Sequence, residues 1–92
     1  MIPIEAVLAR LSGLDAPMLE SWIAREWVRP ARQAGHLVFD EIDVARCRLI
    51  LELRDELEVN DAAIPVVLQL LDQLHLTRRQ LRRVAEALVE IR

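Results

Sequence analysis

The sequence contains no lysine, only two glycines and a single cysteine, and each shortage excludes a kind of site. All twelve basic residues are arginine, a bias that suits bidentate pairing with carboxylates and by itself defines no function. Gly13 and Gly35 stand far apart, so the chain lacks a glycine-rich phosphate-binding loop. Cys47 has no second cysteine for an internal disulfide, and we expect it to be a buried structural thiol.

Residues that carry chemistry are also scarce. His36 and His75 lie far apart, and neither is accompanied by a second cysteine or a His-x-x-Glu spacing, so we expect no metal and no cofactor. Ser12, Ser21 and Asp15 do not form a recognisable set of nucleophile, base and orienting group. We therefore expect that the chain is not an enzyme, and that both histidines lie on the surface.

Long apolar runs are absent as well. Although 53% of the residues are hydrophobic, polar residues interrupt every stretch before the roughly 20 residues that a membrane span needs. Residues 1–5 show no basic region followed by an apolar region, as a secretory signal would. These patterns predict a soluble cytoplasmic protein.

The charge is divided unevenly along the 92 residues. Residues 1–76 hold seven Arg against thirteen Asp and Glu, whereas residues 77–92 hold five Arg against two Glu. Affinity for duplex DNA depends on basic side chains that neutralise phosphates, so an acidic body disfavours ordinary DNA binding. We expect the partner to be a basic surface.

The first third of the chain predicts two short helices. Gly13 stops the first helix, Asp15 caps the second, Pro17 stands in its first turn, and Pro30 ends it. Apolar residues at helical spacing form the two stripes: Ile4, Val7, Leu8 and Leu11 in the first, then Met18, Leu19, Trp22, Ile23 and Trp27 in the second. We expect Trp22 to lie in the core; for Trp27, at the helix end, core and contact positions are equally favoured.

A small β-hairpin and a third helix follow. Residues 28–39 combine a proline, a glycine turn and the β-compatible run His36-Leu37-Val38-Phe39, which predicts a hairpin wing. Asp40 caps a third helix from Glu41 to about Leu57. One face of this helix is apolar: Ile42, Ala45, Leu49, Leu53 and Leu57.

A fourth helix is predicted from about Asp61, capped by Asn60, to the C-terminus. From Val67 onward its apolar residues repeat with heptad spacing: Val67, Leu70, Leu74, Thr77, Leu81, Val84, Leu88 and Ile91. This seam either folds back on the domain or forms a homodimer; we favour a homodimer, through Leu74, Leu81, Val84 and Leu88. The arginines beside it, Arg78, Arg79, Arg82 and Arg83, are more typical of solubility and pairing than of nucleic-acid binding.

The chain resembles the MerR family through an ordered set of residues: Gly13-Leu14-Asp15, Trp22, Val28 to Arg32, Gly35 to Asp40 and Asp43 to Arg46. The resemblance implies a mainly α fold: a MerR-like winged helix-turn-helix over residues 1–60 with a small β wing, and a long C-terminal helical segment over residues 61–92, in a single domain. The continuation, Leu51 to Leu57, Asn60 and Val67 to Leu74, resembles more particularly the CbpM chaperone-modulatory proteins.

The departures from MerR regulators concern their DNA-reading surface. Residues 18–26, the second helix, offer one Arg against two Glu, and Leu37 stands where the wing of the regulators usually has Arg. Base and phosphate contacts are therefore poorly supplied. A MerR-type DNA-binding transcriptional regulator remains the alternative function, and a purely structural dimerisation module is a third.

Resemblance to CbpM implies a chaperone modulator that binds the J-domain of a DnaJ-like co-chaperone of the CbpA type and inhibits its cooperation with a DnaK-type chaperone. Residues 40–61 hold eight carboxylates against three Arg, which suits an encounter with a basic J-domain helix. An exposed aromatic or aliphatic anchor would supply most of the affinity. We expect the binding patch at the wing and its neighbours: Trp27, Arg29, His36, Val38, Asp40, Glu41 and Asp43.

Overall fold

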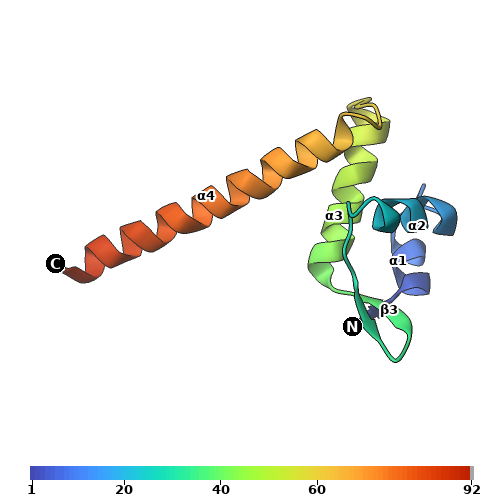
Figure 1. Cartoon of the computed structure of the whole chain (residues 1–92), viewed down its shortest axis with the longest axis horizontal. Coiled ribbons are helices and arrows are strands. Elements are labelled where there is room, and N and C mark those ends of the chain that lie inside the picture. The colour runs from blue at the N-terminus through green and yellow to red at the C-terminus, as the bar shows by residue number, and fades with distance from the viewer. Residues whose placement is uncertain (92) are drawn as a thin grey trace.

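A computed structural model describes residues 1–91. The chain forms a small body from which one long helix projects, as Figure 1 shows. The elements are β1 (Ile2–Pro3), α1 (Ile4–Arg10), α2 (Ala16–Ala24), β2 (Ala31–Gln33), β3 (His36–Phe39), α3 (Glu41–Leu51), the π-helical turn η1 (Glu52–Glu56) and α4 (Ile64–Ile91). This confirms the predicted mainly α, MerR-like winged helix-turn-helix with a small wing and a long C-terminal helix.

Helix α2 begins as predicted and ends early. The Asp15 side chain accepts a hydrogen bond of 2.9 Å from the Met18 amide, and Pro17 lies in the first turn. Glu26 then adopts a left-handed conformation (φ 61°), and the Trp27 amide donates to the Trp22 carbonyl at 2.9 Å. This Schellman-type end stops the helix at Ala24, well before Pro30.

The wing is a three-stranded antiparallel sheet in the order β1-β3-β2. The predicted hairpin pairs Gln33 with His36, so its loop is Ala34-Gly35, both with positive φ (50° and 78°) as a type I′ turn requires. Strand β1, which the sequence did not predict, pairs Ile2 with Phe39. A strand of two residues is too short to show an alternation of apolar and polar residues. It forms because the edge of β3 is available for pairing.

Helix α3 is continuous with η1. Asp40 caps α3 as predicted, but in the π-helical turn the chain advances fewer degrees per residue than in an α-helix. Leu53 remains buried, while Leu57 is rotated outward and is 68% exposed. The predicted buried face is therefore wrong at Ile42, which is 77% exposed, and at Ala45 and Leu57, which are also exposed. The residues that α3 and η1 bury are Val44, Cys47, Ile50, Leu51 and Leu53.

Helix α4 starts three residues later than predicted. The Asn60 side chain accepts a hydrogen bond of 2.9 Å from the Ala63 amide and so caps the turn that leads into the helix. Pro65 falls in the first turn, where backbone N–H groups have no intrahelical acceptor in any case. Within residues 1–91, no helix is long and apolar enough to cross a membrane.

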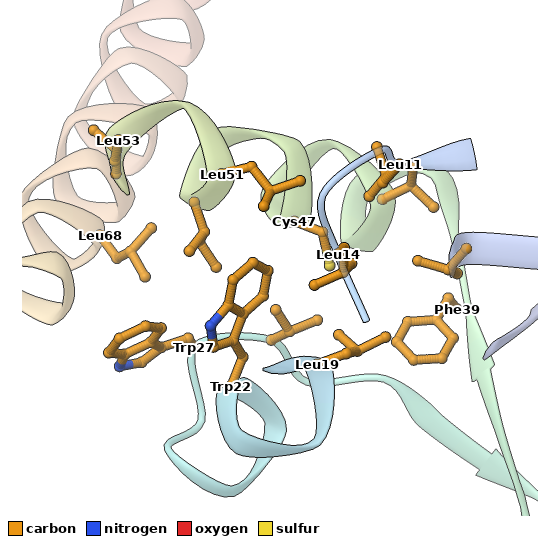
Figure 2. Packing of buried hydrophobic residues seen from close by; sticks show 14 of the residues in the cluster. Leu11, Leu14, Leu19, Trp22, Trp27, Phe39, Cys47, Leu51, Leu53 and Leu68 are labelled. Atoms are coloured by element: carbon orange, nitrogen blue, oxygen red, sulfur yellow. The ribbon is translucent and has the colours of Figure 1, made fainter. Parts of the chain in front are cut away.

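The core lies between α1, α2, the wing, α3 and the first turns of α4, and Figure 2 shows most of it. Trp22 and Cys47 are buried there, as predicted. Leu68 of α4 joins them, and beyond Leu71 every described side chain of α4 is exposed. The fully buried side chains are Phe39, Leu19, Ile50, Ile64, Val7, Val28, Val44 and Cys47.

Candidate functional site

Trp27 is part of the core and not an exposed anchor. It is 5% exposed, its ring centroid lies 6.5 Å from that of Trp22, and the Arg25 guanidinium lies 5.0 Å from its ring. The turn that ends α2 carries Trp27 back over Trp22, as Figure 2 shows, because the hydrophobic contact between these two positions accompanies a Schellman end. The prediction that Trp27 offers an exposed contact is wrong.

The carboxylates of Asp40 and Asp43 stabilise the start of α3. Asp40 Oδ1 accepts from the Asp43 amide at 2.8 Å, and Asp43 Oδ2 accepts from the Asp40 amide at 3.0 Å. This is a reciprocal capping box. Partial burial, opposed by the hydrogen bond from the Asp40 amide, raises the pKa of the Asp43 carboxyl.

Glu41 forms an ion pair with Arg10 of α1. Arg10 Nη1 and Nη2 donate to the two carboxylate oxygens of Glu41 at 3.1 and 2.9 Å. This hydrogen-bonded pair holds the pKa of the Glu41 carboxyl below its usual range. All three predicted contact carboxylates of α3 therefore already have partners within the fold.

The remaining predicted contact residues lie on and beside the wing. Arg29 and His36 are exposed, whereas Val38 is half-buried in the central strand between Pro3 and Ala31. Arg32 of β2 is exposed as well, so the wing surface is basic. The structure thus divides the predicted patch into a buried Trp27, a basic wing and the acidic start of α3.

Helix α2, which occupies the recognition-helix position, contains no basic residue. Its exposed side chains include Pro17, Glu20 and Ala24. Arg25 follows at the helix end, where it lies over Trp27 and 3.6 Å from the Asp61 carboxylate. The helix itself offers no cationic side chain to a phosphate.

A second acidic surface, which we call the η1 end, lies within the acidic stretch 40–61 noted in the sequence, but the predicted binding patch did not include it. Leu57 stands at its centre, exposed. Five exposed carboxylates surround it in sequence: Glu52, Asp55, Glu56, Glu58 and Asp61. Two of these carboxylates lie near arginines: Asp55 is 3.8 Å from Arg54, the only basic residue among residues 52–61, and Asp61 is 3.6 Å from Arg25. Charge alone indicated this segment, but helical periodicity assigned Leu57 to the core.

The predicted dimerisation residues lie on the projecting part of α4. Leu74, Leu81, Val84 and Leu88 are all exposed, at 43 to 68%. A groove of about 560 Å³ lies in the angle between α3 and α4. Its apolar lining is Ile42, Ala45, Leu49 and Leu71, and its polar rim is Arg46, Asp72, His75, Arg78, Arg79 and Arg82.

Comparison with known proteins is consistent with this architecture. Residues 4–86 match the family model described as MerR HTH family regulatory protein. No curated protein and no solved structure matches the chain. The match covers most of the chain, from α1 into the last third of α4. The chain belongs to the MerR helix-turn-helix family of regulatory proteins.

Proposed function

We propose that the chain is a chaperone modulator that binds the J-domain of a DnaJ-like co-chaperone of the CbpA type. Bound there, it would block the surface through which the co-chaperone engages a DnaK-type chaperone, as its resemblance to the CbpM proteins implies. The observation that supports the proposal is the η1 end, where Leu57 is exposed and five exposed carboxylates lie within five residues of it in the sequence. The DNA-facing helix of the fold, by contrast, has no basic residue.

The η1 end supports binding to a basic helix in two ways. Its carboxylates supply a field that steers a cationic surface and sets its orientation. Leu57 supplies an exposed aliphatic side chain, and its burial against a partner would be favourable. A J-domain that uses a basic helix to engage its chaperone matches both features.

The start of α3 is a weaker candidate for this contact. Asp40 and Asp43 are committed to the capping box, and Glu41 to Arg10. A partner that drew on these carboxylates would have to compete with hydrogen bonds of the fold. Charge reversal there would also destabilise α3, so a loss of binding would not identify a contact.

The test is calorimetric titration of a purified J-domain with the native chain and with the double variant Asp55→Lys/Glu56→Lys. We expect at least about tenfold weaker binding for the variant, with the difference shrinking as salt rises. The matched control is Glu5→Lys/Glu20→Lys, which makes the same change in net charge on exposed residues of α1 and α2. Leu57→Asp should also weaken binding.

A functional readout separates binding from inhibition. The chain should suppress co-chaperone stimulation of the DnaK-type ATPase, and Leu57→Asp should relieve that suppression. Absence of binding heat with every J-domain tried would refute the proposed function. Equal loss of binding in both double variants would show that net charge matters and that the η1 end does not.

DNA-binding transcriptional regulation is the second candidate, and one observation favours it. Three exposed arginines follow the helix in the sequence: Arg25 at the end of α2, Arg29 before the wing, and Arg32 in β2. They are the basic residues that this part of the chain could offer to phosphates. Sequence-selective retardation of duplex DNA, lost in Arg29→Ala/Arg32→Ala and falling steeply with salt, would support this function.

A further inference from the structure

The groove between α3 and α4 has two sides of different chemistry. Its aliphatic side comes mainly from α3, where Ile42 is 77% exposed and Leu49 is half-buried. Its polar side comes from α4, which continues past the groove as it diverges from α3 (Figure 1). The polar residues contributed by α4 are Asp72, His75, Arg78, Arg79 and Arg82.

The groove is the basic part of an acidic molecule. The whole chain has a net charge of −3, yet the charged residues that line the groove are four arginines and one aspartate. The aspartate, Asp72, accepts hydrogen bonds from Arg46 with both of its carboxylate oxygens, at 2.8 and 3.2 Å. Within residues 1–91, no carboxylate forms an ion pair with Arg78, Arg79 or Arg82. The lining therefore presents three positive charges that the described part of the fold does not neutralise.

The basic side of the groove is a separate face of α4. Leu71, which lies at the bottom of the groove, is followed by His75, Arg78 and Arg82 at spacings of four, three and four residues, so these side chains share one face. Leu70 of the heptad seam precedes Leu71 and is rotated from it by about 100° around the helix. The groove and the seam are thus different surfaces of the same helix.

Both sides of the groove match the chemistry of an acidic amphipathic helix. Ile42 and Leu49 are two turns apart on α3, about 10 Å, so a second helix can cover them with aliphatic side chains at i, i+3 or i+4, and i+7. Arg78 and Arg82 are one turn apart, about 6 Å, a separation that matches carboxylates at i and i+4 of the same ligand helix. Arginine pairs with carboxylates in a bidentate and directional way.

Other occupants would satisfy only one side of the groove. The phosphates of a nucleic acid would pair with the arginines and leave Ile42 and Leu49 uncovered. A small amphipathic anion would be poorly enclosed, because ligand pockets bury most of their ligand, whereas this groove leaves Ile42 largely exposed. A helix needs to bury only one of its faces, and an open groove is sufficient for that.

We propose that the groove between α3 and α4 docks an acidic amphipathic helix of a partner protein. Carboxylates of that helix pair with Arg78 and Arg82, and its aliphatic side chains pack on Ile42 and Leu49. The site goes beyond the proposed function, which concerns the acidic η1 end and a basic helix. The chain then has two docking surfaces that select partners of opposite charge.

Fluorescence anisotropy with a labelled helical peptide tests the chemistry of the site on the full chain. The peptide has about 15 residues, with leucines at i, i+3, i+4 and i+7 and glutamates on the flanking positions. We expect saturable binding with a Kd of about 10 to 100 μM that weakens as salt rises. Peptides with glutamine for glutamate, or alanine for leucine, should bind at least about tenfold more weakly. Absence of saturable binding of the acidic peptide would overturn the proposal.

The double variant Arg78→Ala/Arg82→Ala tests the basic side. Alanine is a strong helix former, so α4 should persist, and we expect at least about tenfold weaker binding of the acidic peptide. The matched control is Arg48→Ala/Arg83→Ala, which removes the same charge from exposed residues of α3 and α4 outside the groove. It should bind as the native chain does, and an equal loss in both double variants would overturn the groove as the site.

The variant Ile42→Asn tests the aliphatic side without a change in charge. Because Ile42 is largely exposed, the body should fold as in the native chain, which a thermal unfolding curve checks. We expect at least about fivefold weaker peptide binding, since the apolar area of Ile42 is no longer available for burial. Unchanged binding would show that the arginines act alone, and the groove would not be a docking site.

These variants separate the groove from the η1 end. Ile42→Asn should leave J-domain binding intact, and Asp55→Lys/Glu56→Lys should leave peptide binding intact, so that failure of one surface does not decide the other. Tighter binding of duplex DNA or of oleate than of the peptide, lost in Arg78→Ala/Arg82→Ala, would assign the groove to that ligand and overturn the proposal. Peptide binding that disappears as the chain concentration rises would show that a second copy closes the groove, and would overturn it as well.

Discussion

Arg46 and Asp72 form a bidentate ion pair that joins α3 to α4 where the projecting part of α4 leaves the body. Arg46 Nη1 and Nη2 donate to the two carboxylate oxygens of Asp72 at 2.8 and 3.2 Å, and Arg46 Nε donates to the Trp27 carbonyl. One side chain thus connects the end of α2, α3 and α4. Leu68 is the last buried residue of α4, and Asp72 lies one turn beyond it. The ion pair therefore joins α4 to the body where the buried part of the helix ends.

Removal of this ion pair should weaken the attachment of α4 to the body. In a double-mutant cycle with Arg46→Gln and Asp72→Asn, we expect a coupling free energy of about 1 kcal/mol, at the upper end for exposed pairs, since Arg46 is partly buried and the geometry is bidentate. Urea unfolding of the four chains measures it. The coupling free energy should decrease at high salt. A value near zero at low salt would show that the ion pair adds nothing to the attachment of α4, which would then rest on the packing of Leu68.

The capping box should contribute measurably to the stability of the body. Asp40→Ala removes the acceptor of the Asp43 amide and should lower the free energy of unfolding by about 1 kcal/mol. Asp40→Asn keeps a capping oxygen and should cost much less. The same unfolding experiment distinguishes them, and equal stability of the alanine and native chains would contradict a stabilising role for the cap.

The sequence predicts these caps because each depends on residues close together in the chain. Asp15, Asp40 and Asn60 each accept a hydrogen bond from the amide three residues later, so the sequence is sufficient to find them. The winged helix-turn-helix was recognised for a similar reason, since its turns and wing occur as an ordered set of local patterns. The core position of Trp22 follows directly from helical periodicity.

The errors arise where a nonlocal or irregular feature intervenes. Strand β1 exists because the edge of β3 is available, and the π-helical turn rotates Leu57 away from the face that periodicity assigned to it. The sequence left Trp27 equally divided between core and contact, because the turn at Glu26 that returns it to the core was not predicted and Pro30 was taken as the end of α2. The partner contacts at Asp40, Glu41 and Asp43 remain a prediction, although each of these carboxylates also has a partner within the fold.

Glu26 should be replaceable by glycine with a gain in stability. Its φ of 61° is the left-handed conformation that the residue after a helix end requires, and a side chain there costs about 1 kcal/mol relative to glycine. Glu26→Gly should therefore raise the thermal midpoint. The adjacent Arg25 is the control: it has a φ of −84°, so Arg25→Gly should be less stable than Arg25→Ala, a comparison in which both variants lack the contacts of Arg25 with Trp27 and Asp61. Two changes of the same sign would contradict the conformational explanation.

Cys47 should govern how the stability of the body depends on alkaline pH. Its side chain is buried, and this burial raises the pKa of the thiol to about 11. In the unfolded chain the thiol ionises near pH 8.5. Between about pH 9 and pH 11 the folded chain therefore binds more protons than the unfolded chain, and stability falls as the pH rises.

The composition of the chain leaves few other groups that could cause a pH dependence in this range. With no lysine and no tyrosine, Cys47 is the one side chain expected to titrate in that range. Urea unfolding at successive alkaline pH values should show the native chain losing stability while Cys47→Ala stays nearly constant, so that the two curves converge. If the free energies of unfolding of the two chains ran parallel with pH, the thiol would ionise as readily in the folded chain as in the unfolded one. That result would contradict the burial of Cys47 in the core.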